Sequence, residues 1–208
     1  MKVAAHFVLW KLGLAKAETQ TTEGERDCLA RHAAGRRRVV EIGVWHGVTT
    51  RRLRRAMAAE GVLYAVDPYP AGRLGVSLQL AIAHREVQQE SNGVVRWVRM
   101  TGEQAAQEFD HIGDGRPDFV FIDGDHSWEG LKGDWDGWSR HVVPDGVIAL
   151  HDSRATPVRP IHDAGSVRFT CEVINRDTRF ELIDVVDTLS VFRRRCDPGT
   201  VSRGGEAG

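Results

Sequence analysis

The chain has 208 residues, of which 41% are hydrophobic and 27% charged, so it can form one globular domain without a disulfide or a structural metal. Its net charge of −1 requires neither nucleic acid nor an anionic membrane as a partner, and no segment approaches the roughly 20 apolar residues that span a bilayer. The three cysteines form no zinc-type or disulfide pattern, which indicates a reducing, cytoplasmic setting.

The order of the predicted elements is that of an α/β protein. Residues 1–35 form an N-terminal helical segment, in which Thr22 caps a helix that runs to about Ala34. Five short apolar runs then alternate with helical segments, which specifies a parallel sheet covered by helices on both faces. The predicted strands are 39–43, 62–67, 94–100, 118–123 and 146–150, and the predicted helices are 49–59, 76–90, 103–109 and 128–141.

The C-terminal part breaks this alternation. The strand-like runs 179–184 and 189–194 are joined by only residues 185–188, which is too short for a parallel crossover, so they predict an antiparallel hairpin. We therefore predict a Rossmann-like domain over residues 36–195, with a mostly parallel seven-stranded sheet that ends in this hairpin. The Gly-rich, polar residues 196–208 predict a disordered tail.

The end of the first predicted strand carries a candidate cofactor loop. Gly43 and Gly47 allow a sharp turn before a helix N-terminus, although this spacing also fits a purely structural turn. Asp67 ends the next strand and is placed to bind a ribose diol. Glu41 beside the loop would disfavour a pyrophosphate but would suit the cationic amino and sulfonium groups of S-adenosylmethionine (SAM). This argues against a nicotinamide cofactor.

These residues resemble the first two motifs of the class I SAM-dependent methyltransferases. In that family the first strand ends E/D-x-G-x-x-x-G, the second ends in an acidic residue, and the sheet finishes with an antiparallel hairpin. The resemblance covers residues 39–194 and implies that the loop after the third strand meets the adenine. The residues that it implies for SAM binding are Glu41, Gly43, Trp45, Gly47, Asp67, Thr101, Gly102, Glu103 and Asp123.

Acidic and imidazole side chains follow the fourth and fifth predicted strands, whose carboxyl ends should be adjacent. Such side chains suit Mg²⁺ or Mn²⁺. A blander interpretation, with a turn at 123–125 and a helix cap at Ser127, explains one segment but not the groups at both strand ends. The residues concerned are Asp123, Asp125, His126, His151 and Asp152.

The two segments resemble the macrocin O-methyltransferases and related small, metal-dependent sugar O-methyltransferases. Those enzymes carry an Ile/Leu-Asp-Gly-Asp motif on strand four and an acidic pair after strand five. The resemblance implies Asp123 and Asp152 as metal ligands. His151 replaces the first acid of the pair and would either bind the metal itself or contact a residue that does. A bound ion would lower the pKa of the acceptor hydroxyl. His126 is the first choice for the base that removes its proton, and Asp123 is the second.

Residues 155–165 are expected to arch over the acceptor site. The candidate acceptor contacts are Tyr69, His126, Arg159 and His162. The family analogy favours a sugar or a glycosylated metabolite as acceptor. The Arg-, Ala- and Gly-rich composition is typical of actinobacteria, and the mycobacterial methylmannose polysaccharide pathway is one candidate setting.

Other functions stay open at this point. A catechol-type hydroxyl or a nitrogen atom could be the acceptor, and metal dependence would separate oxygen from nitrogen chemistry. The arginines at 36–38 and 51–55 could face RNA, but charge runs on helices are usually solvated, so we expect no nucleic-acid or membrane partner. A non-catalytic SAM-binding module would leave the clustered acids and histidines without a purpose. The apolar N-terminal stretch suggests a homodimer contact.

Overall fold

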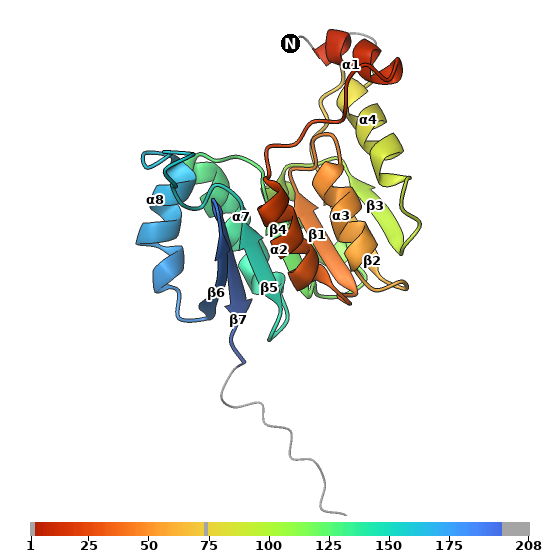
Figure 1. Ribbon diagram of the computed structural model, residues 1–208. Helices are drawn as coiled ribbons and strands as arrows, with labels where there is room; N and C mark the ends of the chain where they lie inside the picture. Colours follow the sequence, from red (N-terminus) through yellow and green to blue (C-terminus); the bar gives the residue numbers. More distant parts are fainter. Residues whose placement is uncertain (1–2, 73–74, 197–208) are drawn as a thin grey trace, which may run out of the picture.

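The computed structural model describes residues 3–72 and 75–196, and its centre is one seven-stranded sheet (Figure 1). The strand order is β3-β2-β1-β4-β5-β7-β6. Strands β1 to β5 are parallel, whereas β7 is antiparallel to both of its neighbours. The predicted fold class is therefore confirmed. The strands are β1 (Arg38–Ile42), β2 (Val62–Val66), β3 (Val94–Val98), β4 (Phe119–Ile122), β5 (Val147–Leu150), β6 (Phe180–Val186) and β7 (Leu189–Arg194).

Helices cover both faces of the sheet, and each face has its own hydrophobic core. Successive side chains of a strand point to opposite faces, so Val39 packs with Leu29 and Leu53 while Val40 packs with Trp135. The helices are α1 (Val3–Lys11), α2 (Glu23–Ala33), α3 (Val48–Ala56), α4 (Leu78–Val87), α5 (Gly102–Gln107), α6 (Phe109–Ile112), α7 (Trp128–His141) and α8 (Gly165–Glu172), followed by the 3-10 turn η1 (Ile174–Arg176).

The N-terminal segment contains two helices that pack in different places. The first, α1, contacts α4 at one end of the molecule, whereas α2 contributes Cys28, Leu29 and Ala33 to a core of the sheet (Figure 1). Thr22 caps α2 as predicted, and it does so within a capping box shared with Glu25. None of the helices in the described ranges is long and apolar enough to cross a membrane.

The structure adds two helices that the sequence did not predict, α6 and α8. The helix α8 begins after Ala164, whose side chain provides no cap, so its start lacks the usual signal. Its stability comes from packing, because Val167 and Phe169 are buried. The tail predicted at 196–208 lies outside the described residues apart from Cys196, which belongs to no helix or strand.

Candidate active site

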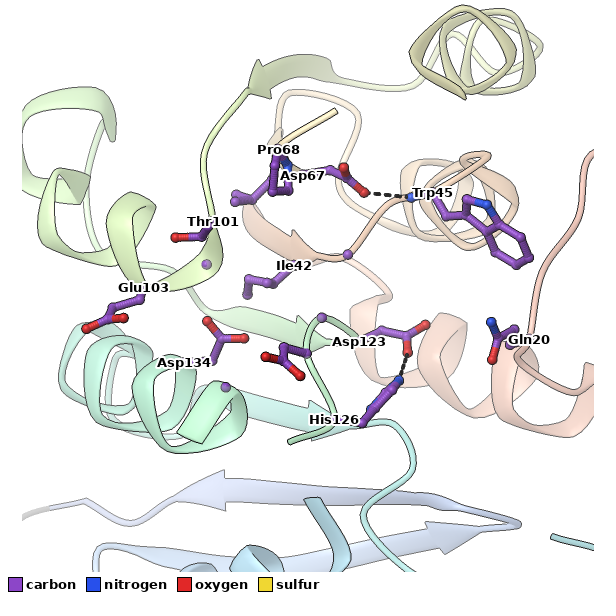
Figure 2. Close-up of a pocket in the computed structure, with 16 residues that line it drawn as sticks. Gln20, Ile42, Trp45, Asp67, Pro68, Thr101, Glu103, Asp123, His126 and Asp134 are labelled. Carbon is purple, nitrogen blue, oxygen red and sulfur yellow. Dashed lines mark hydrogen bonds and ion pairs between the residues drawn. The ribbon is translucent and has the colours of Figure 1, made fainter. Parts of the chain in front are cut away.

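A cavity of about 680 Å³ lies at the carboxyl ends of the parallel strands (Figure 2). From β1 the chain adds β2 and β3 on one side of the sheet and then crosses to add β4 and β5 on the other side. The cavity lies between β1 and β4, where the strand order reverses. Most of the predicted SAM-binding residues line it, whereas Glu41 and Gly47 do not. The predicted SAM-binding residues found in its lining are Gly43, Trp45, Asp67, Thr101, Gly102, Glu103 and Asp123.

Gly43 is the point where the ends of β1 and β4 come together. Its φ of +85° lies in the left-handed region, and a Cβ atom there would overlap the carbonyl group of Asp123. Only glycine therefore lets the two loops approach so closely. Gly47 has a different role just before α3. Its φ of +76° favours glycine, and a Cβ atom there would lie 3.1 Å from the backbone of Ala83, so glycine lets the chain pack closely against α4.

Asp67 organises the loop that follows β1. One of its carboxylate oxygens accepts hydrogen bonds from the backbone N–H groups of Val44 (3.1 Å) and Trp45 (3.0 Å) (Figure 2). The other oxygen accepts from the backbone N–H of Tyr69 at 2.9 Å. Each carboxylate oxygen has two acceptor positions, so the oxygen hydrogen-bonded to Tyr69 can still accept one hydrogen bond from a ligand hydroxyl in the cavity.

Glu41 lies beneath the loop instead of in the cavity. It is completely buried, and none of the described residues makes a well-formed hydrogen bond to its carboxyl oxygens, although the Thr50 side chain interacts with them. Burial, reinforced by the charges of Asp123 and Asp67, raises the pKa of Glu41 well above its usual value and so favours the protonated form. Protonation weakens the attraction of Glu41 for a cationic ligand, which leaves that role to other acids. The predicted contact of Glu41 with SAM stays a prediction.

Those other acids are found in the cavity lining itself. It includes Asp67, Glu103, Asp123, Asp125 and Asp134, whereas none of the lining residues that the structure describes is a lysine or an arginine. The cavity therefore favours a ligand with positive charge and disfavours a pyrophosphate.

The residues after β4 and β5 meet at one side of the cavity, as predicted. The Nδ1 atom of His151 lies 2.7 Å from Oδ1 of Asp123. The Nε2 atom of His126 lies 3.5 Å from the same oxygen and 3.9 Å from Oδ2 of Asp152 (Figure 2). His126 and Asp123 line the cavity, whereas His151 and Asp152 are buried behind them.

Glu25 of α2 completes this group, and sequence reasoning missed it as a site residue. Its carboxylate accepts hydrogen bonds from the backbone N–H (2.9 Å) and hydroxyl (2.7 Å) of Thr188, and it lies 3.5 Å from Nε2 of His151. Burial would raise the pKa of Glu25, but hydrogen bonds from His151, Thr188 and Thr22 outweigh it and lower the pKa to about 2. No motif marked Glu25 as a site residue, because an acid in the first turn of a helix capped by Thr22 is ordinary.

His151 is held as an imidazolium between the two carboxylates. Burial alone would lower its pKa, but hydrogen bonds to Asp123 and Glu25 outweigh burial and raise the pKa to about 10. At pH 7 both ring nitrogens therefore carry protons, and neither can bind a metal ion.

The predicted metal ligands do not form a free binding site in this arrangement. Asp152 pairs with the guanidinium of Arg159, and His151 is protonated. The three groups close enough to share one ion are Asp123, His126 and His151, whose ligand atoms lie within 4.8 Å of one another. A divalent ion would have to displace a proton from His151 and compete with the Arg159 guanidinium for Asp152. The residues present therefore do not fit a divalent ion.

The predicted acceptor contacts are spread over a wider region than expected. Of the four predicted acceptor contacts, His126 is the one that lines the cavity. Tyr69 is buried, and its hydroxyl donates to the carbonyl of Trp45 at 3.0 Å. Arg159 faces Asp152, and His162 is exposed on the loop before α8. The roles proposed for Tyr69, Arg159 and His162 stay predictions.

Sequence reasoning also missed Gln20 and Asp134, both of which line the cavity. Gln20 belongs to the segment between α1 and α2, and no motif marks it. Asp134 does carry a signal, because it stands on the buried stripe of α7 with Leu131, Trp135 and Trp138. A lone acid at a core position of an amphipathic helix is unusual and points to a function.

The strand order with its reversed last strand, together with an acidic cavity at the switch point, is typical of class I SAM-dependent methyltransferases. The chain belongs to the methyltransferase-domain family, whose model matches residues 40–153 and thus more than half of the chain. The uncharacterised protein y4gI from Sinorhizobium fredii is 28% identical over 125 residues, which are 59% of this chain. The match covers 14% of that relative, so the chain spans only a small part of its length.

Solved structures of methyltransferases share the fold. The O-methyltransferase TomG from Streptomyces achromogenes, solved with SAM, is 15% identical with a TM-score of 0.65, and the match covers 94% of this chain and 91% of TomG. An O-methyltransferase from Bacillus cereus in complex with SAH is 18% identical (TM-score 0.62, coverage 93% and 89%). The N-methyltransferase NodS from Bradyrhizobium japonicum is 15% identical (TM-score 0.56, coverage 82% and 93%). The fold therefore does not decide which acceptor atom is methylated.

Proposed function

We propose that the protein transfers the methyl group of SAM to a hydroxyl oxygen of a small molecule. The observation that carries this proposal is the position of His126, an imidazole at the cavity wall whose Nε2 lies 3.5 Å from the carboxylate of Asp123. A hydroxyl group needs a base before it becomes a good nucleophile, and a positioned imidazole is suited to that task.

The cavity supplies groups that match each part of SAM. Asp67 is available for the ribose hydroxyls, and the loop of Gly102 and Glu103 for the adenine. The acids of the lining favour the sulfonium, which is the group that supplies an electrophilic methyl carbon. His126 and Asp123 lie in the part of the cavity away from Glu103, so the acceptor would enter beside His126 (Figure 2).

In the proposed reaction His126 removes the proton of the acceptor hydroxyl, and Asp123 supports His126. The acceptor oxygen forms a bond to the methyl carbon, the carbon–sulfur bond breaks with its electron pair going to sulfur, and the hydroxyl proton passes to His126. Asp123 orients the imidazole and stabilises the imidazolium that results. His151 donates to Asp123 and fixes the position of that carboxylate.

Proton removal by His126 and Asp123 does not need a divalent ion. The sequence resemblance implied Mg²⁺ or Mn²⁺, but His151 and Arg159 already neutralise the acids that would bind it. Unchanged methyl transfer in the presence of EDTA is the expected result, and restoration of activity by added Mg²⁺ would favour the metal-assisted alternative instead.

For the acceptor, we favour a sugar hydroxyl or a glycosylated metabolite, on the resemblance to the macrocin O-methyltransferases. A neutral amine attacks without losing a proton first, so the positioned base favours oxygen over nitrogen.

The test combines SAM binding with activity on a panel of sugars and catechols. We expect Asp67→Ala to abolish SAM binding measured by calorimetry. We expect His126→Ala to keep SAM affinity while kcat falls by about 10²- to 10⁴-fold. His111→Ala, at an exposed histidine on α6, is the matched control and should change neither quantity. A wild-type protein that does not bind SAM, or a His126→Ala variant with full activity, would contradict the proposal.

A further inference from the structure

Asp134 is a buried acid at the cavity wall that the mechanism above does not use. It lies on α7, is 5% exposed and lines the cavity next to Gly102 and Gly124. Figure 2 shows its carboxylate near Glu103 and Thr101, on the side of the cavity away from Trp45 and Gln20. The rest of the buried stripe on α7 is mainly apolar and includes Trp135 and Trp138.

No group of the described chain satisfies this carboxylate. None of the hydrogen bonds or ion pairs among the described residues involves Asp134, although other acids nearby have partners, such as Asp125 with the N–H of Ser127. Burial, and then the charges of Asp125 and Glu103, raise the pKa of Asp134 to about 7. Burying an acid without a partner is unfavourable, so packing alone does not explain this residue.

The backbone around Asp134 is shaped to leave room for its two oxygens. A Cβ atom on Gly102 would overlap Oδ1 of Asp134, and one on Gly124 would lie 3.2 Å from Oδ2. The carboxylate therefore lies against two glycines, one in the loop after β3 and one in the loop after β4. Trp138, one turn along α7, donates a hydrogen bond to the carbonyl of Gly102 at 3.0 Å and holds this loop in place.

We propose that Asp134 is the residue that recognises the adenine base of SAM, by accepting a hydrogen bond from its exocyclic 6-amino group. This inference rests on the proposed function, because it requires SAM in the cavity. The amino group is a donor with no charge, and it satisfies the buried carboxyl group whether that group is ionised or protonated. A purine without the amino group would leave Asp134 without a partner.

The test compares two ligands and three variants by calorimetry at pH 7. The ligands are S-adenosylhomocysteine and its 6-deamino analogue, in which purine replaces adenine. Asp134→Ala removes the acceptor, and Asp134→Asn keeps one. Asp136→Ala is the matched control, because Asp136 is an exposed acid on the same helix that pairs with Lys132 at 2.7 Å.

We expect wild type and Asp136→Ala to prefer S-adenosylhomocysteine about tenfold or more, since an unsatisfied buried acceptor is costly. Asp134→Ala should bind both ligands equally, and Asp134→Asn should keep most of the preference. Without ligand, Asp134→Ala should melt no lower than wild type, because it removes an unpartnered buried acid. Equal binding of both ligands by wild type, or a preference that persists in Asp134→Ala, would overturn the inference. If wild type binds neither ligand, the proposed function fails, and this inference with it.

Discussion

His151 is the side chain whose charge depends most directly on the fold. It is 1% exposed, and its two ring nitrogens face Asp123 at 2.7 Å and Glu25 at 3.5 Å. The pKa of a histidine in the unfolded chain is about 6.5, and folding raises it to about 10. Protonation of His151 is therefore linked to folding.

This linkage predicts how stability changes at alkaline pH. Because the pKa is raised in the folded state, the stabilisation is fully present below pH 6.5 and is lost as the pH rises towards 10. The free energy of unfolding should fall with pH in this window by up to about 1.4 kcal/mol per pH unit more than in His151→Gln. Urea denaturation with EDTA from pH 6 to 10 measures the two slopes. Parallel slopes would mean that His151 is neutral in the folded protein.

The site residues that could be predicted from the sequence follow strands, whereas those that could not be predicted lie on helices. Asp67, Asp123 and His126 follow strand ends, and parallel strands bring their carboxyl ends together whatever the loops do. Glu25 and Asp134 reach the site from helices, and their positions depend on how each helix packs against the sheet. The protonation of His151 could not be predicted either, because it depends on Glu25.

The junction of β1 with β4 is the most crowded contact between two elements at the site. Gly43 and Gly35 both have positive φ, +85° and +69°, but a Cβ atom on Gly35 would meet no atom within 4 Å. An alanine at Gly35 therefore has only the cost of the left-handed backbone, whereas an alanine at Gly43 has that cost and the cost of the overlap with Asp123.

We expect Gly35→Ala to lower the free energy of unfolding by about 1 kcal/mol, which is the cost of a left-handed alanine. Gly43→Ala should cost several kcal/mol, because the overlap with Asp123 forces β1 and β4 apart, and the remaining folded protein should bind SAM poorly. Chemical denaturation and calorimetry measure the two effects. Equal losses in both variants would show that the close approach at Gly43 is unimportant.

Among the helices and strands, those with strong local signals were predicted best. The strands are short apolar runs, four of which were predicted to end in glycine or aspartate, and all seven are confirmed within a few residues. Helix α4 begins at Leu78 instead of residue 76, because Ser77 caps it with a hydrogen bond to the N–H of Leu80. Helix α8 could not be predicted, because it lacks a side-chain cap and depends on burial of Phe169.

The distribution of charge over the protein is uneven although its net charge is only −1. Five acids line the cavity, and within residues 3–72 and 75–196 no lysine or arginine lines it, so the lysines and arginines of this part of the chain lie elsewhere. A ligand that enters the cavity therefore meets a negative potential that the net charge does not reveal.

This potential predicts that SAM binds more tightly than S-adenosylhomocysteine, which lacks the sulfonium charge. The preference should be largest at low ionic strength and should shrink as salt screens the acids. Calorimetry at about 20 mM and 500 mM NaCl, spanning Debye lengths from about 20 Å to about 4 Å, measures it. An analogue with an amino group in place of the sulfonium is the charge control and should follow SAM. A preference that does not change with salt would assign it to shape instead of charge.

The interior position of β7 also bears on how the protein is made. This strand follows the other six in the sequence, yet it lies between β5 and β6 and provides the pairing that holds β6 in the sheet. Thr188, immediately before it, secures Glu25 from the first quarter of the chain. A nascent chain can therefore form its earlier strands but cannot complete the surroundings of His151 until Thr188 and β7 have left the ribosome. Activity should arise only after β7 has been synthesised, and a premature stop before β7 should leave a chain with no partial function.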